Sequence, residues 1–211
     1  MCLKKAFCPV LTAIVLLGFS VIESQASLVV IGDINLIAAP SDISVGAIVD
    51  PTNVTAFVEQ TNVAAPAIGG TNPSIAEGTL VNSYFFSWNP QATVTQTDKT
   101  FSGTKATFSN TILAVYHIDA DLDATDASFG LSSMGTTYPS GLTFRGTRKD
   151  SGADNGESND SFTVSGNMLT INRLFTNDPG IDQIRVITAV PEPTSFALFG
   201  LALIGFARRR R

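Results

Sequence analysis

Residues 79–88 read TLVNSYFFSW and decide how the rest of the chain is interpreted. Aromatic side chains favour strands. Successive side chains of a strand point to opposite faces, so Tyr84, Phe86 and Trp88 share one face and Phe85 lies on the other. The stretch therefore predicts a β-strand with an aromatic face.

That aromatic face has two interpretations. If exposed, Tyr84, Phe86 and Trp88 would form a platform for sugar rings, as in a carbohydrate-binding module. If buried, they belong to the core. We prefer the core, because aromatic side chains dominate core burial.

The same alternation recurs along the chain and predicts about ten strands. No stretch of the body has a sustained helical period of apolar residues, and Gly166 and Asn167 fit a tight hairpin turn. Short strands at roughly 8 to 12-residue spacing predict an all-β single domain, a β-sandwich or jelly roll. The expected strands are residues 28–37, 43–49, 54–60, 79–88, 92–97, 104–109, 112–123, 141–145, 161–165, 168–175 and 183–188.

An acidic run lies in the expected strand 112–123. There His117, Asp119, Asp121 and Asp123 would share one face, with carboxylates about 7 Å apart. Like charges in a row repel, and a Ca²⁺ ion would relieve the repulsion. The candidate calcium ligands are Asp119, Asp121, Asp123 and Asp126, but a solvated, charged strand face is the preferred interpretation.

Two further observations bear on calcium. The run does not match an EF-hand loop, because Ala124 and Gly130 occupy the positions that need Gly and Glu. Residues 148–160, RKDSGADNGESND, predict an exposed acidic loop. Its acids could bind Ca²⁺ if the loop folded back, although a metal-free flexible loop is preferred; they are Asp150, Asp154, Glu157 and Asp160.

Catalytic signatures are few. His117 is the only histidine. The nearest approach to a nucleophile elbow surrounds Ser132, where Met134 replaces the required glycine. No HExxH or P-loop motif is present. We therefore predict that the protein is not an enzyme, and keep a carboxylate-dependent hydrolase as an alternative.

The N-terminus has the pattern of a secretory signal peptide. Lysines at positions 4 and 5 precede an apolar run at 10–19, and small residues precede a cleavage point between Ala26 and Ser27. We predict that signal peptidase removes residues 1–26. Cys2 and Cys8 leave with them, so stability must come from the core and not from disulfides.

The C-terminal residues 190–211 read VPEPTSFALFGLALIGFARRRR and have three parts. As a helix, the uncharged segment 194–207 would span about 21 Å, short for a hydrocarbon core of about 30 Å. The positive-inside rule places the basic end in the cytoplasm. The parts are the motif Val190, Pro191, Glu192 and Pro193, the apolar segment 194–207, and the basic end Arg208, Arg209, Arg210 and Arg211.

These three parts in this order resemble the PEP-CTERM sorting signal of exported bacterial proteins. The resemblance implies processing by an exosortase, a membrane-embedded protease that would cut near the motif. It also implies a setting of exopolysaccharide and biofilm. Residues 108–116, FSNTILAVY, and 182–188, DQIRVIT, resemble ectodomains often attached to such tails. That second resemblance implies no activity.

The net charge of the body excludes two classes of partner. The two ends carry six of the 13 basic and two of the 18 acidic residues, which leaves 7 basic and 16 acidic residues and a net charge near −9 in the body. An acidic body repels nucleic acid and anionic membrane surfaces.

We thus expect a signal peptide (1–26), a β-sandwich ectodomain (27–189) and a sorting signal (190–211). The expected role is structural or adhesive, in the envelope or biofilm, with exopolysaccharide as a possible partner. A carbohydrate-binding module, with or without calcium, is the alternative.

Overall fold

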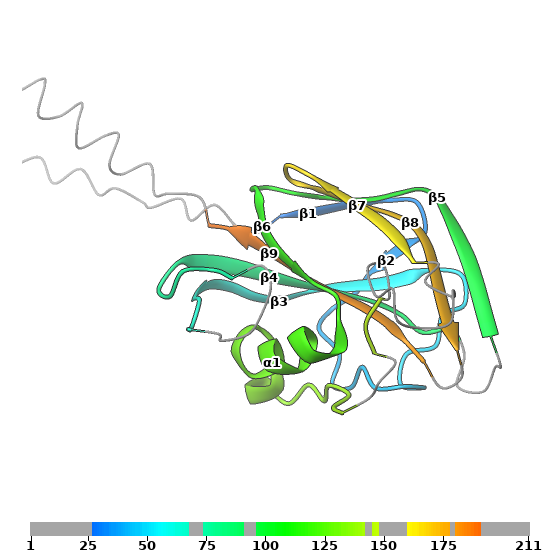
Figure 1. Cartoon of the computed structure of the whole chain (residues 1–211), viewed down its shortest axis with the longest axis horizontal. Coiled ribbons are helices and arrows are strands. Elements are labelled where there is room, and N and C mark those ends of the chain that lie inside the picture. The colour runs from blue at the N-terminus through cyan, green and yellow to red at the C-terminus, as the bar shows by residue number, and fades with distance from the viewer. Residues whose placement is uncertain are drawn as a thin grey trace, which may run out of the picture. The chain divides into compact units, whose positions relative to one another are not determined.

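The computed structural model describes residues 27–67, 74–90, 96–141, 145–147, 160–177 and 180–190, which form two β-sheets and a helical layer (Figure 1). Order within one sheet is β1 (Leu28–Ile31), β5 (Gln96–Phe108), β8 (Met168–Asn177) and β7 (Ser161–Ser165). Order within the other is β2 (Ile34–Leu36), β3 (Val54–Ala64), β4 (Leu80–Trp88), β9 (Asp182–Ala189) and β6 (Ile112–Tyr116). The helices are α1 (Asp119–Phe129) and the short η1 (Ser132–Met134). The all-β prediction is confirmed at this level.

The main core lies between the two sheets. Tyr84, Phe86 and Trp88 on β4 are each at most 1% exposed. Across the interface, the ring of Tyr84 lies 4.8 Å from that of Phe108, and the ring of Trp88 lies 5.7 Å from that of Phe101. The three aromatics therefore form core, as preferred, and the alternative of an exposed sugar platform is wrong.

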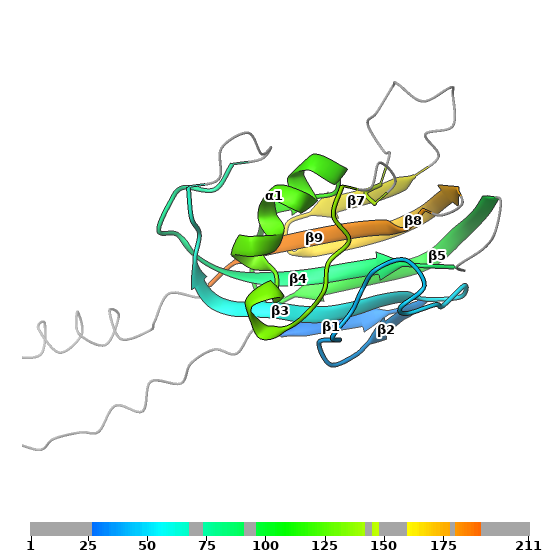
Figure 2. The same cartoon turned by 90° about the horizontal axis from the view of Figure 1, so that it is seen from below.

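A second core covers the other face of the five-stranded sheet. Phe85 of β4 and Tyr116 of β6 pack there with Leu122 and Phe129 of α1. Figure 2 shows α1 lying against this sheet. Since β4 and β9 lie between two cores, they are buried on both faces almost throughout. This explains why β4 carries aromatic residues on both faces.

The expected strand 28–37 is two strands in different sheets. Gly32, with a φ of +82°, lies between β1 and β2. A Cβ at this position would lie 2.7 Å from the side chain of Thr104. The alternation continues across this break, so the pattern alone did not reveal the change of sheet.

The expected strand 43–49 was wrong. These residues form turns, and pairing nearby is limited to an isolated bridge between Asp42 and Thr137. Ile43 is still buried, in the second core. It belongs to the core between the five-stranded sheet and the helical layer without being part of a strand.

The expected strand 112–123 was correct only to Tyr116, because residues 119–129 form α1. Leu122, Thr125 and Phe129 are buried at helical spacing, whereas Asp123 is exposed. Two acids in the first turn, Asp119 and Asp121, favour a helix at this position. The picture of carboxylates in a row on one strand face is therefore wrong.

Other predictions are confirmed, including the turn at Gly166 and Asn167, which joins β7 to β8 with Ser165 opposite Met168. The φ of Gly166 is +61°. Several predictions lie outside the described residues: the signal peptide, the apolar segment and basic end of the tail, the acidic loop up to residue 159, and most of strand 141–145.

Candidate functional site

A buried ionic network fills the space between the five-stranded sheet and the helical layer. Its centre is Arg185 of β9, whose side chain is 0% exposed. The guanidinium has five N–H groups, and all five have acceptors. Nε and Nη2 donate to the Glu59 carboxylate, both at 2.8 Å, and Nη2 also donates to Asp126 Oδ1 at 2.9 Å. Nη1 donates to Thr125 Oγ1 at 2.6 Å and to the Leu122 carbonyl at 3.3 Å.

The carboxylate of Glu59, on β3, also has hydrogen bonds at all its acceptor positions. Besides Arg185, it accepts hydrogen bonds from Ser83 Oγ and Tyr138 Oη, both at 2.6 Å. The Tyr138 oxygen in turn accepts the Leu131 N–H at 2.9 Å. A carboxylate has about four acceptor positions, and all four are used.

The network raises the pKa values of Tyr138 and Arg185. Burial, with the neighbouring Glu59 carboxylate, raises the pKa of Tyr138. For Arg185, burial opposes the charge, but Glu59 and Asp126 outweigh it, so the pKa lies above its ordinary value. The site therefore holds a charged arginine and a neutral tyrosine at neutral pH.

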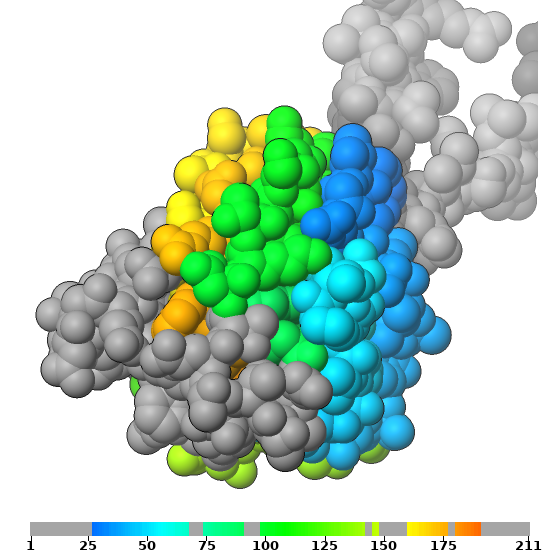
Figure 3. All heavy atoms as spheres, turned by 90° about the vertical axis from the view of Figure 1, so that its right-hand side faces the viewer, coloured from blue at the N-terminus to red at the C-terminus, as the bar shows by residue number. Residues whose placement is uncertain are grey.

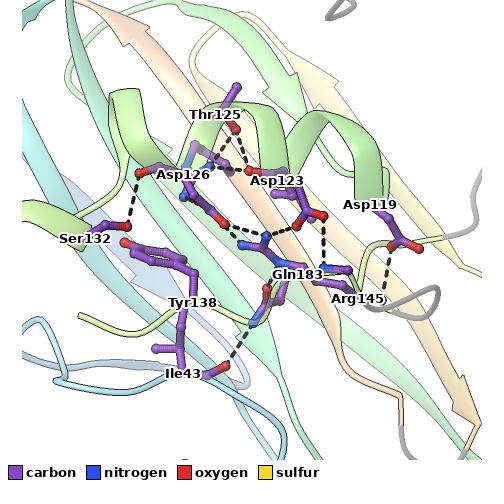
Figure 4. Close-up of polar contacts among 12 residues, drawn as sticks. Ile43, Asp119, Asp123, Thr125, Asp126, Ser132, Tyr138, Arg145 and Gln183 are labelled. Carbon is purple, nitrogen blue, oxygen red and sulfur yellow. Dashed lines mark hydrogen bonds and ion pairs between the residues drawn. The ribbon is translucent and has the colours of Figure 1, made fainter. Parts of the chain in front are cut away.

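A second buried arginine extends the network toward the start of α1 (Figure 4). Arg145 binds Asp126 in a bidentate pair, with contacts of 2.6 and 2.8 Å. It also contacts Asp123 at 2.6 Å and Gln183 of β9 at 2.6 Å. Asp126 therefore bridges Arg145 to Arg185, and its side chain is 14% exposed.

The start of α1 is tied to the same segment. Asp119 Oδ1 accepts the backbone N–H groups of Arg145 and Gly146, at 3.0 and 2.5 Å. Gly146 lies so close to the His117 carbonyl that a Cβ would clash with that backbone atom. Gly146 also bridges to Gln183. The short segment 145–147 thus fixes the helix to the sheet.

These contacts bear on the candidate calcium ligands. Asp123 and Asp126 bind Arg145, and Asp119 binds backbone amides. Among the residues that the structure describes, no group of three or more His, Cys, Asp or Glu side chains is placed to hold a metal ion. Calcium binding stays a prediction. Arg145 supplies Asp123 and Asp126 with a positive charge, where the sequence had favoured solvation and kept an ion as the alternative.

His117 lies apart from the network. Its Nδ1 is 3.0 Å from Thr147 Oγ1, and its ring meets Phe162 edge-on at 5.1 Å. It borders an open groove between the edge strands β6 and β7. Apart from His117 the groove lining is apolar, from Ile112, Leu113, Ala114, Val115, Phe162 and Val164.

Ser132 lies elsewhere, with its hydroxyl 3.5 Å from the Asp126 carbonyl (Figure 4). Ser132 and His117 therefore contact different partners, the Asp126 carbonyl and the Thr147 hydroxyl.

Sequence reasoning missed the residues that matter most here: Glu59, Tyr138, Arg145 and Arg185. One signal was available for Arg185, which lies in the alternating run DQIRVIT. A buried charge is rarely left unpaired, so an arginine inside a strand core implies an acidic partner. The sequence does not show that the partner is Glu59, 126 positions away.

Comparison with known proteins identifies a feature at the C-terminus and not in the folded body. A family model for the PEP-CTERM protein-sorting motif matches residues 189–211. The match begins at Ala189, the last residue of β9. No curated protein and no solved structure matches the chain. Within the described residues, no helix is both long and apolar enough to cross a membrane.

Proposed function

We propose, from the sorting motif at residues 189–211, that this chain is an exported, exosortase-processed component of the bacterial cell surface or extracellular matrix. Signal peptidase removes residues 1–26 before Ser27. The segment 194–207 then holds the protein in the membrane, with Arg208 to Arg211 in the cytoplasm. Exosortase cuts near Pro191–Pro193 and frees the folded body.

One observation carries this proposal: the motif match starts where the last strand ends. The sorting signal therefore follows the body with almost no linker. The released body would have no cysteine, so its stability must come from its core. The two cores and the saturated Arg185–Glu59 pair support such a body.

We propose a structural or adhesive role, and not catalysis, for that body. The buried polar groups of the network are occupied by one another, and the His117 groove lacks a carboxylate among its described lining residues. The main support for a carbohydrate-binding module was an exposed aromatic platform, and those aromatics are buried. Exopolysaccharide remains a proposed partner of the body. Retention of the purified protein on immobilised polysaccharide tests this.

Mass spectrometry of the mature protein tests the sorting. In cells with an exosortase, we expect a C-terminus near residues 190–193, and in cells lacking it an intact Arg211. Glu192→Ala should block cleavage, whereas Ser195→Ala, three residues on, serves as the matched control. An intact tail in exosortase-positive cells would refute the proposal.

The structural role needs a separate test. Deleting the gene should weaken the extracellular matrix, and the wild-type chain should restore it. Restoration by the E192A chain, trapped in the membrane, would contradict a role that depends on release. Hydrolysis of a glycan or peptide by the purified body would revive the enzyme alternative.

A further inference from the structure

Both chain ends of the described body meet at one end of the fold. Ser27 and Ser109 exchange hydrogen bonds, with the Ser109 N–H donating to the Ser27 carbonyl at 3.0 Å. Two residues later, the Thr111 carbonyl accepts the Ala189 N–H at 3.0 Å. One turn, residues 109–111, therefore contacts both the start of β1 and the end of β9.

Further bonds complete this end. The Gly166 carbonyl accepts the Ile112 N–H at 3.0 Å, and Asn167 bonds to Phe108. Val190 N–H donates to the Leu80 carbonyl at 3.4 Å. In Figure 1 the arrowhead of β9 and the β7–β8 turn point to the same side. We call this surface the terminal end, formed by residues 27–28, 64–65, 80, 109–111, 166–167 and 189–190.

The terminal end is unusual for this protein because it is uncharged. Its residues include no Asp, Glu, Lys or Arg, although the body has a net charge near −9. In the neighbouring β3–β4 connection, Glu77 is the one charged residue. Apolar side chains are exposed here: Leu80, within the terminal end, is 49% exposed, and Val164, beside it on β7, is 43% exposed.

Charge gathers at the opposite end, where β5 begins and β8 ends. There Lys99 pairs with Asp33 at 3.2 Å, and Arg173 pairs with Asp98. Figure 3 looks onto this side, with β5 (green) and β8 (orange) next to each other. The fold thus separates a neutral end, which holds both ends of the described body, from a charged end.

The length of chain beyond Val190 restricts where the neutral end can lie. Val190 is hydrogen-bonded within the fold, and the apolar segment begins at Thr194. Four residue steps span at most about 14 Å even when fully extended. A body whose segment 194–207 is in the membrane must therefore keep its terminal end close to the lipid.

We infer that the terminal end is a membrane-facing surface that rests on the phospholipid headgroups while the tail is inserted. The inference rests on the proposed anchoring by segment 194–207. Bacterial inner membranes are negatively charged, and a surface without carboxylates avoids the repulsion that the rest of the body would meet. Uncharged Ser, Asn and Thr side chains can hydrogen-bond to headgroups.

The test uses the exported chain with its tail intact, produced without exosortase, in vesicles of phosphatidylglycerol and phosphatidylethanolamine. Signal-peptide removal leaves no native cysteine, so one can be introduced at Ser165 or at Thr100. Ser165 adjoins the β7–β8 turn, and Thr100 pairs with Arg173, five residues along β8 from Met168 and about 17 Å away. A dye at Ser165 should transfer energy to a headgroup acceptor several-fold more efficiently than a dye at Thr100.

Flotation with the vesicles distinguishes failure of the proposed anchoring from failure of the inferred orientation. A chain that does not float overturns the anchoring proposal itself, and with it this inference. A chain that floats with equal transfer from both positions, or with stronger transfer from Thr100, overturns the orientation alone.

A charge substitution gives a second readout. Ser165→Glu should weaken binding to these anionic vesicles about fivefold relative to phosphatidylcholine vesicles, because one charge is brought next to the surface. Thr100→Glu is the matched control and should change the ratio little. Equal effects of the two substitutions would contradict a membrane-facing terminal end.

Discussion

At the scale of single residues, the fold depends on two arginines that water does not reach. Burying a charge costs several kcal/mol unless partners replace the lost water. Arg185 meets this condition with five acceptors, and its guanidinium lies over the rings of Phe85 and Tyr138 at 5.1 and 5.4 Å. Removing any one partner leaves a charge or a polar group buried and unpaired.

Glu59→Gln should therefore be strongly destabilising. The substitution keeps the shape of the side chain but leaves Arg185 without its main counter-charge, which should cost about 3–5 kcal/mol in the free energy of unfolding. Urea unfolding followed by Trp88 fluorescence measures it. The control is Asp98→Asn, which breaks an exposed pair with Arg173 and should hardly move the midpoint. Equal midpoints for the two variants would rule out a central role for the buried pair.

The raised pKa of Tyr138 predicts how the stability of the fold changes at alkaline pH. Its pKa is raised in the folded state, so above pH 10 the unfolded chain releases this proton while the folded chain keeps it. Stability should fall as pH rises above 10, by up to about 1.4 kcal/mol per pH unit for this group. Tyr138→Phe should be less stable at pH 7 but should show a shallower loss between pH 10 and 11. Parallel pH profiles of the two proteins would contradict this assignment.

At the scale of elements, strands were predictable where local alternation and flanking turn residues were enough to define them. β4, β7 and β9 alternate and end at turn residues, and the structure confirms them within one residue at either end. α1 was missed because DADLDATDASF alternates like a strand and has few apolar residues. The helix is held by Arg145 and Arg185, which come later in the sequence, so local pattern could not reveal it. For the same reason the sequence offered the acids a solvated strand face or, as the alternative, an ion, and not an arginine partner.

Arg145 should control the local stability of α1. Arg145→Lys removes the bidentate contact with Asp126, and each lost charged hydrogen bond costs about 1.5–3 kcal/mol. Hydrogen exchange should show α1 amides losing about tenfold or more of their protection, while β4 and β9 keep most of theirs. Arg173→Lys on the surface of β8 is the control. An equal loss of protection in β4 and β9 would show that the layer does not open separately.

At the scale of the whole molecule, the distribution of charge argues against calcium as a structural requirement. An ion at 100 times its dissociation constant would add about 2.7 kcal/mol of stability, which shifts a melting temperature by several degrees. We expect no such shift when excess EDTA replaces calcium, because Asp123 and Asp126 are already paired with Arg145. A melting temperature that rises by several degrees with calcium would restore the ion site, and Asp123→Asn should then abolish the rise.

The position of the sorting signal predicts that its removal is harmless to the fold. β9 lies between β4 and β6, and its residues up to Thr188 are buried, whereas the motif begins at Val190, after the strand. A chain of residues 27–190 should melt at the same temperature as the chain that keeps its tail. A chain of residues 27–184 loses five of the eight residues of β9, Arg185 among them, and should not fold. If truncation at 190 lowered the melting temperature by several degrees, the tail would be part of the folded body, and cleavage by exosortase would release a weakened protein. Circular dichroism melts of the three chains decide between these outcomes. Cutting after Val190 removes no buried strand residue, whereas cutting six residues earlier removes most of the strand that joins β6 to the rest of its sheet.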